Sequence, residues 1–189
     1  MATHTPTELE KQGSEPLPAA DALAGKFPVH PHPKPADKDE YERIMSTLDF
    51  GRDFTDYMAV ADWNSQEGWH NYRIEPFGPI SLSPAAAVLH YGQEVFEGLK
   101  AYRHADGSVW TFRPRYNAAR FNASARRLAL PELPVEDFVR AVVDLVRADK
   151  RWVPQAEGTS LYLRPFMIAT EAFLGVHSAN NVRSEEHTS

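Results

Sequence analysis

The sequence predicts an α+β fold, because segments with strand character come first, two amphipathic helices follow, and strand character then returns. It lacks the regular strand and helix alternation of a doubly wound parallel sheet, and no internal repeat is visible. Its 189 residues are 42% hydrophobic and 24% charged, which suits one globular domain or part of a two-domain protein.

The predicted strands are short runs rich in aromatic and β-branched residues. Residues 55–61 and 71–77 are two such runs, bounded by Gly and Pro. Residues 95–103 and 108–113 flank a turn that contains Asp106-Gly107, and Asp-Gly supplies the positive φ angles of a tight hairpin. We therefore expect a β-hairpin in the middle of the chain.

Two helices are predicted after the hairpin. Pro114 suits the first turn of one, and the dipole of the other favours Glu136 near its start and Lys150 near its end. Each has one apolar face, formed by Phe121, Ala125 and Leu128 in the first and by Phe138, Val142 and Leu145 in the second. Strand character returns at residues 159–170, where Pro165 indicates an edge strand or a bulge.

The two ends of the chain differ from this folded part. Residues 1–39 are rich in proline and hold Phe27 as their only aromatic residue, so we expect a flexible extension. The folded domain is expected over residues 40–176 and a truncated tail over 177–189. The last seven residues, Arg183-Ser184-Glu185-Glu186-His187-Thr188-Ser189, match the translation of a common sequencing adapter, which predicts an artefact and a reading frame cut short. An ordinary polar tail is the alternative.

Composition excludes several classes of function. The net charge is −6 and no long basic run exists, so nucleic-acid binding is not expected. Prolines break the longest uncharged run, residues 76–93, so no membrane span is expected. The absence of cysteine and of a secretory signal favours the cytoplasm. We expect no metal site, because the standard ligand motifs are missing.

A few charged and aromatic residues remain as candidates for a ligand site. Tyr162 and Arg164 would leave one face of a strand together, where they could bind a carboxylate, although spacing alone favours a stacked surface pair. Arg120 lies on an arginine-rich helix that could hold a phosphate or form a solvated face. Glu97 could form an ion pair with Lys100 or, less readily, act as an acid or base.

Three motifs together resemble the branched-chain amino acid aminotransferases. They are L-H-Y-G-Q-E-V-F-E-G-L-K-A-Y-R at 89–103, F-R-P-R-Y-N-A-A-R-F at 112–121 and L-Y-L-R-P at 161–165. These enzymes use pyridoxal 5'-phosphate and have the D-amino-acid-aminotransferase-like fold, known as fold type IV. The resemblance covers roughly residues 40–180, in what would be the small N-terminal α+β domain.

The resemblance implies roles for five residues. Arg120 matches the arginine that binds the cofactor phosphate. Tyr91 and Phe96 match side chains around the substrate's branched side chain, and Tyr162 and Arg164 match the pair on the carboxylate side. The lysine that forms the Schiff base lies later in the family, so no catalytic residue is expected in this chain and it is expected to be inactive alone.

The implied activity is amino transfer between leucine, isoleucine or valine and 2-oxoglutarate, by a homodimer with sites near its interface. A D-amino acid aminotransferase and an aminodeoxychorismate lyase share the fold and are alternatives, because a fold alone does not fix the substrate. A non-catalytic binding or dimerisation module is the alternative if the chain is complete.

Overall fold

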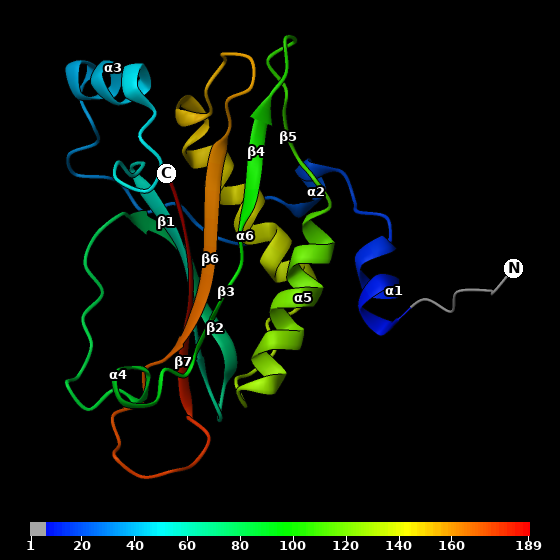
Figure 1. The fold of residues 1–189 in the computed structure, drawn as a ribbon, viewed down its shortest axis with the longest axis vertical. Coiled ribbons are helices and arrows are strands. Elements are labelled where there is room, and N and C mark those ends of the chain that lie inside the picture. Colours follow the sequence, from blue (N-terminus) through cyan, green and yellow to red (C-terminus); the bar gives the residue numbers. More distant parts are fainter. Residues whose placement is uncertain (1–6) are drawn as a thin grey trace, which may run out of the picture.

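The computed structural model describes residues 7–189 and contains one antiparallel sheet with helices packed on one face (Figure 1). The strands are β1 (Tyr57–Asn64), β2 (Gly68–Pro76), β3 (Glu94–Phe96), β4 (Leu99–Arg103), β5 (Val109–Thr111), β6 (Leu161–Ala169) and β7 (Asn181–Thr188). The helices are α1 (Glu8–Ser14), α2 (Ala20–Leu23), α3 (Lys38–Thr47), α4 (Ala87–Tyr91), α5 (Pro114–Arg127) and α6 (Val135–Ala148), followed by the 3-10 turn η1 (Lys150–Trp152). The predicted α+β class is confirmed.

The sheet has the strand order β2-β1-β7-β6-β4-β5, with β3 also paired to β6. Strands β3 and β4 lie on the same side of β6 and are separated by Glu97 and Gly98. Opposite this interruption is Pro165, whose carbonyl accepts a hydrogen bond from the Glu97 N–H. Sequence reasoning predicted an edge strand or a bulge at Pro165. The structure places it in an interior strand instead, and the irregularity lies in its neighbours.

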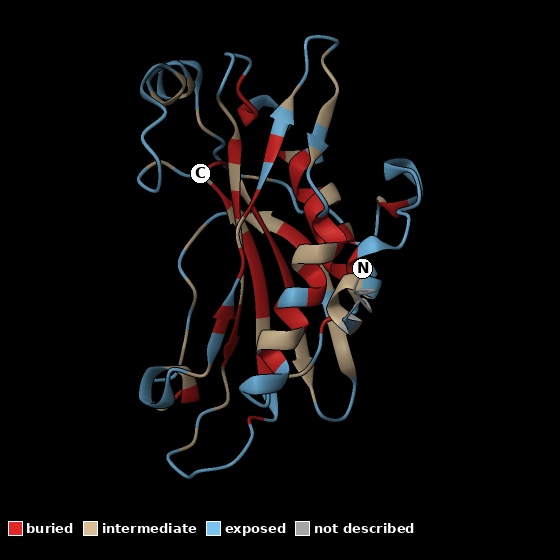
Figure 2. Cartoon of the chain, turned by 45° about the vertical axis from the view of Figure 1, so that its right-hand side comes forward, coloured by how far each residue is buried: buried red, intermediate tan, exposed pale blue. Residues whose placement is uncertain are grey.

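Helices α5 and α6 cover one face of the sheet and form the core with it (Figure 2). The largest fully buried side chains include Phe121 on α5 and Leu163 and Met167 on β6. Because successive strand residues point to opposite faces, the side chains between those on β6 point away from these helices. The predicted hairpin is confirmed, since Tyr102 of β4 pairs with Trp110 of β5 and Gly107 has a φ of 80°.

The segment before the sheet differs from the flexible extension expected over residues 1–39, of which 1–6 lie outside the described residues. Leu23 and Phe27 are 2% and 3% exposed, within the two clusters of core residues. The Asp144 carboxylate on α6 accepts hydrogen bonds from the backbone N–H groups of Gly25 and Phe27, at 2.7 and 3.0 Å. Proline-rich composition was a poor guide here, because two apolar side chains and one carboxylate anchor the segment.

This packing predicts that the N-terminal segment stabilises the domain. Phe27→Ala is expected to lower the free energy of unfolding by about 3–5 kcal/mol, because it leaves a cavity in the core. Leu17→Ala is the control, since Leu17 is 37% exposed and should cost far less. Urea unfolding measures both variants. If Phe27→Ala and Leu17→Ala both lower the free energy of unfolding by the same small amount, the N-terminal segment does not stabilise the domain.

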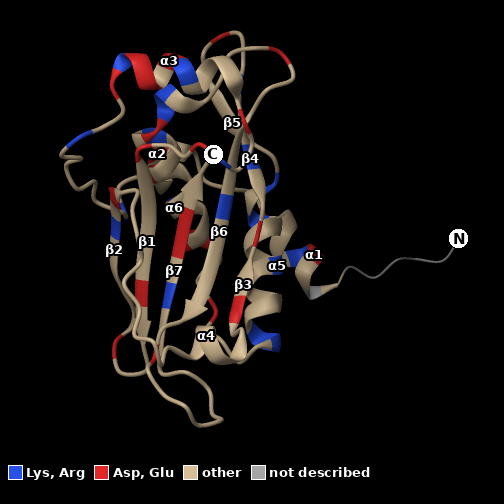
Figure 3. Cartoon of the chain, turned by 60° about the vertical axis from the view of Figure 1, so that its left-hand side comes forward, with Lys and Arg blue, Asp and Glu red and all other residues tan. Residues whose placement is uncertain are grey.

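Strand β7 contains most of the residues 177–189 that were expected to form a truncated tail, and it lies between β1 and β6 (Figure 3). Glu185 and Glu186 are each 3% exposed. Burial raises the pKa of Glu185 to about 7 and raises that of Glu186 well above its ordinary range. One oxygen of Glu186 has no hydrogen-bond partner among the described residues. Buried carboxyl groups are unusual in an interior strand, so β7 differs in composition from the other strands of the sheet.

The buried carboxyl groups predict a domain that is less stable at high pH. Between pH 4.5 and 7 the folded chain keeps protons on Glu185 that the unfolded chain releases, so stability falls as pH rises. Glu185 alone contributes a change on the order of 3 kcal/mol. Urea unfolding at pH 5 and pH 8 tests this, and Glu185→Gln should reduce the difference while exposed Glu157→Gln should not. A difference that Glu185→Gln leaves intact would contradict the assignment to Glu185.

Candidate functional site

An open cavity of about 550 Å³ lies on the face of the sheet that points away from α5 and α6. Its lining comes from β3, β6, β7 and the loop before β1. The lining residues are Phe50, Gly51, Phe54, Glu94, Val95, Phe96, Tyr162, Arg164, Phe166, His187 and Ser189. Of the five predicted site residues, three lie here: Phe96, Tyr162 and Arg164.

Strand alternation and register bring these side chains together. Tyr162, Arg164 and Phe166 are alternate residues of β6, so they share one face. Phe96 of β3 is the register partner of Phe166. The ring of Phe50, in the loop before β1, lies edge-on to that of Tyr162 with centroids 5.0 Å apart. The result is a largely aromatic wall with one cation in it.

Tyr162 and Arg164 contact each other directly, as their spacing predicted. Nε and Nη2 of Arg164 donate to the Tyr162 hydroxyl oxygen at 3.1 and 2.8 Å. The guanidinium also lies over the ring of Phe96, 4.6 Å from its centroid. Because the hydroxyl accepts both of these bonds, its own proton is left to donate elsewhere. The pair thus offers a hydroxyl donor and a cation, a combination suited to a carboxylate.

Gly98 allows Tyr162 to adopt this position. A Cβ atom at residue 98 would come within 2.3 Å of the Tyr162 hydroxyl oxygen. On its other side the Gly98 carbonyl accepts a hydrogen bond from the Asn117 side chain at 3.2 Å. Gly98, which has no side chain, therefore lies between the cavity and helix α5.

Arg120 does not line the cavity. It projects from α5 and forms a two-point ion pair with Glu97, with Nε to Oε1 at 2.6 Å and Nη2 to Oε2 at 2.7 Å. Hydrogen bonding to Glu97 raises the pKa of Arg120 above its ordinary value. The suggested pair of Glu97 with Lys100 is not formed, because Lys100 is exposed on the opposite face of its strand. The predicted role of Arg120 in phosphate binding stays a prediction.

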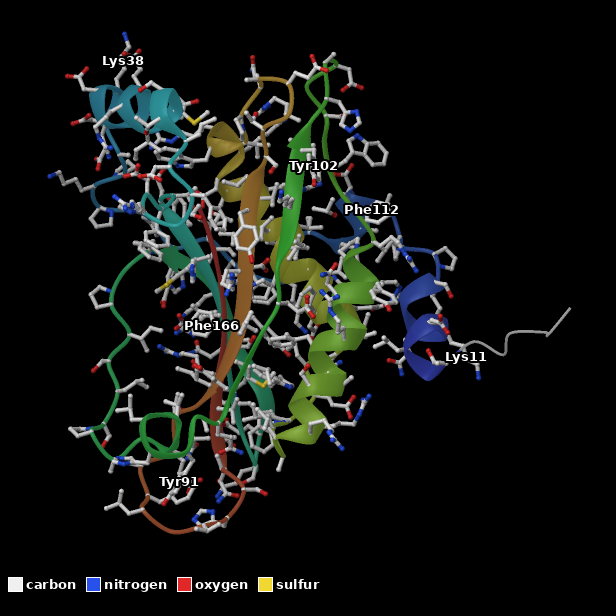
Figure 4. All side chains as sticks on the ribbon, viewed as in Figure 1. Lys11, Lys38, Tyr91, Tyr102, Phe112 and Phe166 are labelled. Atoms are coloured by element: carbon white, nitrogen blue, oxygen red, sulfur yellow. The ribbon has the colours of Figure 1, made fainter. Side chains whose placement is uncertain are left out.

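Tyr91 also lies outside the cavity. It is at the end of α4, and its hydroxyl donates to the Leu174 carbonyl at 2.8 Å. It lines a separate hollow with Leu128 and Val176. Figure 4 shows Tyr91 near the lower end of the sheet, apart from Phe166. Within one chain the structure does not bring Tyr91 to Phe96, so its predicted role stays a prediction.

Sequence reasoning assigned no site role to Phe50, Phe54, Phe166 or His187, which also line the cavity. The alternation that paired Tyr162 with Arg164 extends to Phe166, so that residue could have been found. His187 required knowledge of β7, which was expected to be a tail. Burial and the nearby Arg164 lower the pKa of His187.

No helix within residues 7–189 is long and apolar enough to cross a bilayer. In the same part of the chain, no three His, Asp or Glu side chains are grouped to hold a metal ion.

Comparison with known proteins identifies relatives of this chain. No model of a protein family matches it. It is 54% identical over 159 residues to the branched-chain-amino-acid aminotransferase of Mycolicibacterium smegmatis, covering 84% of this chain and 43% of that enzyme. It is 52% identical over 136 residues to Bacillus subtilis branched-chain-amino-acid transaminase 1, covering 72% and 38%. Over the matched part, the chain belongs to the branched-chain-amino-acid aminotransferase family. It spans about two fifths of the length of these relatives.

Solved structures agree on the fold. The branched-chain amino acid aminotransferase of Escherichia coli has a TM-score of 0.55 and 21% identity, covering 70% of this chain and 39% of that one. The enzyme from Thermobaculum terrenum, solved in its PLP form, has a TM-score of 0.53 and 22% identity, covering 71% and 40%. The predicted fold, the small domain of fold type IV aminotransferases, is confirmed.

The contact between Gly98 and Tyr162 gives a testable prediction. Gly98→Ala is expected to lower the free energy of unfolding by about 1–3 kcal/mol, because the added methyl group overlaps the tyrosine hydroxyl. The double variant Gly98→Ala/Tyr162→Phe should regain part of that loss, since it removes the oxygen that is overlapped. Urea unfolding compares the single and double variants. No recovery in the double variant would show that the hydroxyl is not the atom displaced.

Proposed function

We propose that this chain forms part of an enzyme that transfers the amino group of leucine, isoleucine or valine to 2-oxoglutarate with pyridoxal 5'-phosphate. The observation that carries the proposal is the aromatic cavity with the Tyr162–Arg164 pair on its wall, in a chain 54% identical to a branched-chain-amino-acid aminotransferase. An apolar amino acid needs apolar walls for its side chain and fixed polar groups for its carboxylate.

The cavity offers both kinds of surface. Phe96 and Phe166 would contact the branched side chain of the substrate. The Tyr162 hydroxyl and the edge of Arg164 that does not face it would bind the α-carboxylate. Leucine and 2-oxoglutarate each carry an α-carboxylate, so the same pair would serve both half-reactions.

Arg120 fits the phosphate of the cofactor. Its side chain is 51% exposed and is held from one edge by Glu97. Nη1 has no hydrogen-bond partner among the described residues, so it can donate to a phosphate oxygen. When bound, pyridoxal phosphate supplies an electron sink for the reacting carbon of the amino acid. The other parts of this proposal are a homodimer and a cytoplasmic location.

The proposal can be tested in a fusion of residues 7–182 to the part of the M. smegmatis enzyme that this chain does not match. The fusion is expected to transaminate leucine, isoleucine and valine with 2-oxoglutarate, and to sediment as a dimer. A D-amino acid aminotransferase would act on D-alanine instead, and an aminodeoxychorismate lyase would release pyruvate from its own substrate. A folded fusion that binds the cofactor but acts on none of the three branched amino acids would contradict the proposal.

In this fusion, Arg164→Lys is expected to lower kcat/KM for leucine and for 2-oxoglutarate. An ammonium group cannot reproduce the planar geometry of the guanidinium, so we expect a loss of about 1.5–3 kcal/mol in transition-state binding, roughly tenfold to more than a hundredfold. Cofactor affinity should be nearly unchanged. Arg126→Lys is the matched control, because Arg126 pairs with Glu132 at 2.6 Å outside the cavity. An effect on 2-oxoglutarate alone would mean that Arg164 binds the distal carboxylate of that substrate.

A further inference from the structure

The ion pair between Glu97 and Arg120 joins two side chains in very different surroundings. The Glu97 side chain is 4% exposed, whereas that of Arg120 is 51% exposed. Two parallel hydrogen bonds connect them, at 2.6 and 2.7 Å, so the carboxylate and the guanidinium are held edge to edge. The buried partner thus fixes the plane and the direction of the exposed one.

Glu97 is itself held by three other groups. Its Oε2 atom accepts hydrogen bonds from Asn117 Nδ2 at 3.0 Å and from the Gly98 N–H at 3.3 Å. The backbone N–H of Glu97 donates to Pro165 at 2.8 Å. Asn117 lies on α5, one helix turn before Arg120, so the same helix supplies both the arginine and the amide that supports its partner. A carboxylate with this many partners has little freedom to rotate.

We propose that Glu97 is a positioning residue, which orients Arg120 so that the opposite edge of its guanidinium, with Nη1, is presented to a phosphate group. This rests on the proposed function, in which Arg120 binds the cofactor phosphate. Glu97 then acts through Arg120 and does not itself touch the ligand. The acid or base role considered from the sequence is not needed.

Glu97 has two opposing effects on phosphate binding at Arg120. Its negative charge lowers the positive potential there, which weakens the attraction for an anion. Its two hydrogen bonds restrict the arginine to one orientation, which reduces the entropy lost on binding. A purely electrostatic role and a positioning role therefore predict opposite results when the charge is removed. Glu97→Gln separates them, because the amide has the same size but can no longer accept from both guanidinium nitrogens.

The test uses the ¹⁵N-labelled 189-residue chain and inorganic phosphate as the probe. NMR follows the Nε–Hε signal of Arg120, assigned with Arg120→Lys. In Glu97→Gln we expect faster rotation of the Arg120 guanidinium and an apparent Kd for phosphate at least threefold higher. Unchanged rotation, or an unchanged or lower Kd, would overturn the proposal. Glu132→Gln, which removes the partner of Arg126 on the same helix, should change neither quantity at Arg120.

Asn117→Ser provides a second variant in case Glu97→Gln does not fold. It removes the amide that supports Glu97, so an intermediate rise in both the rotation rate and the Kd is expected, and no rise would count against the proposal. If phosphate does not shift the Arg120 signal of the unmodified chain, the assignment of Arg120 to the cofactor phosphate fails. The guanidinium rotation rates still report separately on whether Glu97 orients Arg120.

Discussion

Strand β6 contains a proline opposite the point where its neighbouring strands are interrupted, and the candidate site depends on that interruption. Pro165 has no N–H group, so it can offer only its carbonyl to the strand beside it. Strands β3 and β4 pair with β6 on either side of this point, and Glu97 and Gly98 connect them. The connection remains in place because the Glu97 N–H donates to the Pro165 carbonyl.

The two connecting residues face in opposite directions and serve opposite sides of the sheet. Glu97 points toward α5, where its carboxylate meets Arg120. Gly98 faces the cavity, where the hydroxyl of Tyr162 occupies the space that a side chain would fill. A short irregular segment thereby contacts both the helix layer, through Glu97 and Arg120, and the open face, through Gly98 and Tyr162.

The sequence was sufficient to predict what depends on local pattern. The hairpin at Asp106-Gly107, the helix beginning at Pro114 and the shared face of Tyr162 and Arg164 are all local consequences of turn chemistry or of strand and helix periods. The resemblance to aminotransferases, based on three short motifs, predicted the family and the fold. The same local reasoning extended one residue pair further would have added Phe166 to the site.

Features that depend on distant partners could not be predicted in this way. Phe27 is buried because α6 and β2 surround it, and a count of prolines carries no information about those contacts. The partner of Glu97 is 23 residues away on a helix, while Lys100, nearer in sequence, points elsewhere. Strand β7 was invisible to pattern analysis because its two buried glutamates are the opposite of what a strand in the core normally contains.

The anchoring of the N-terminal segment by Asp144 has a consequence for synthesis of the chain. Gly25 is made 119 residues before the carboxylate that holds it. At about 5–20 residues per second, a ribosome needs roughly 6–24 seconds to cover that distance. During that interval the α6 side chains that pack against Leu23 and Phe27 have not yet been synthesised. The apolar side chains of this segment therefore stay without their α6 contacts until α6 has been translated, and a chaperone bound to the nascent chain here would delay completion of the core until then.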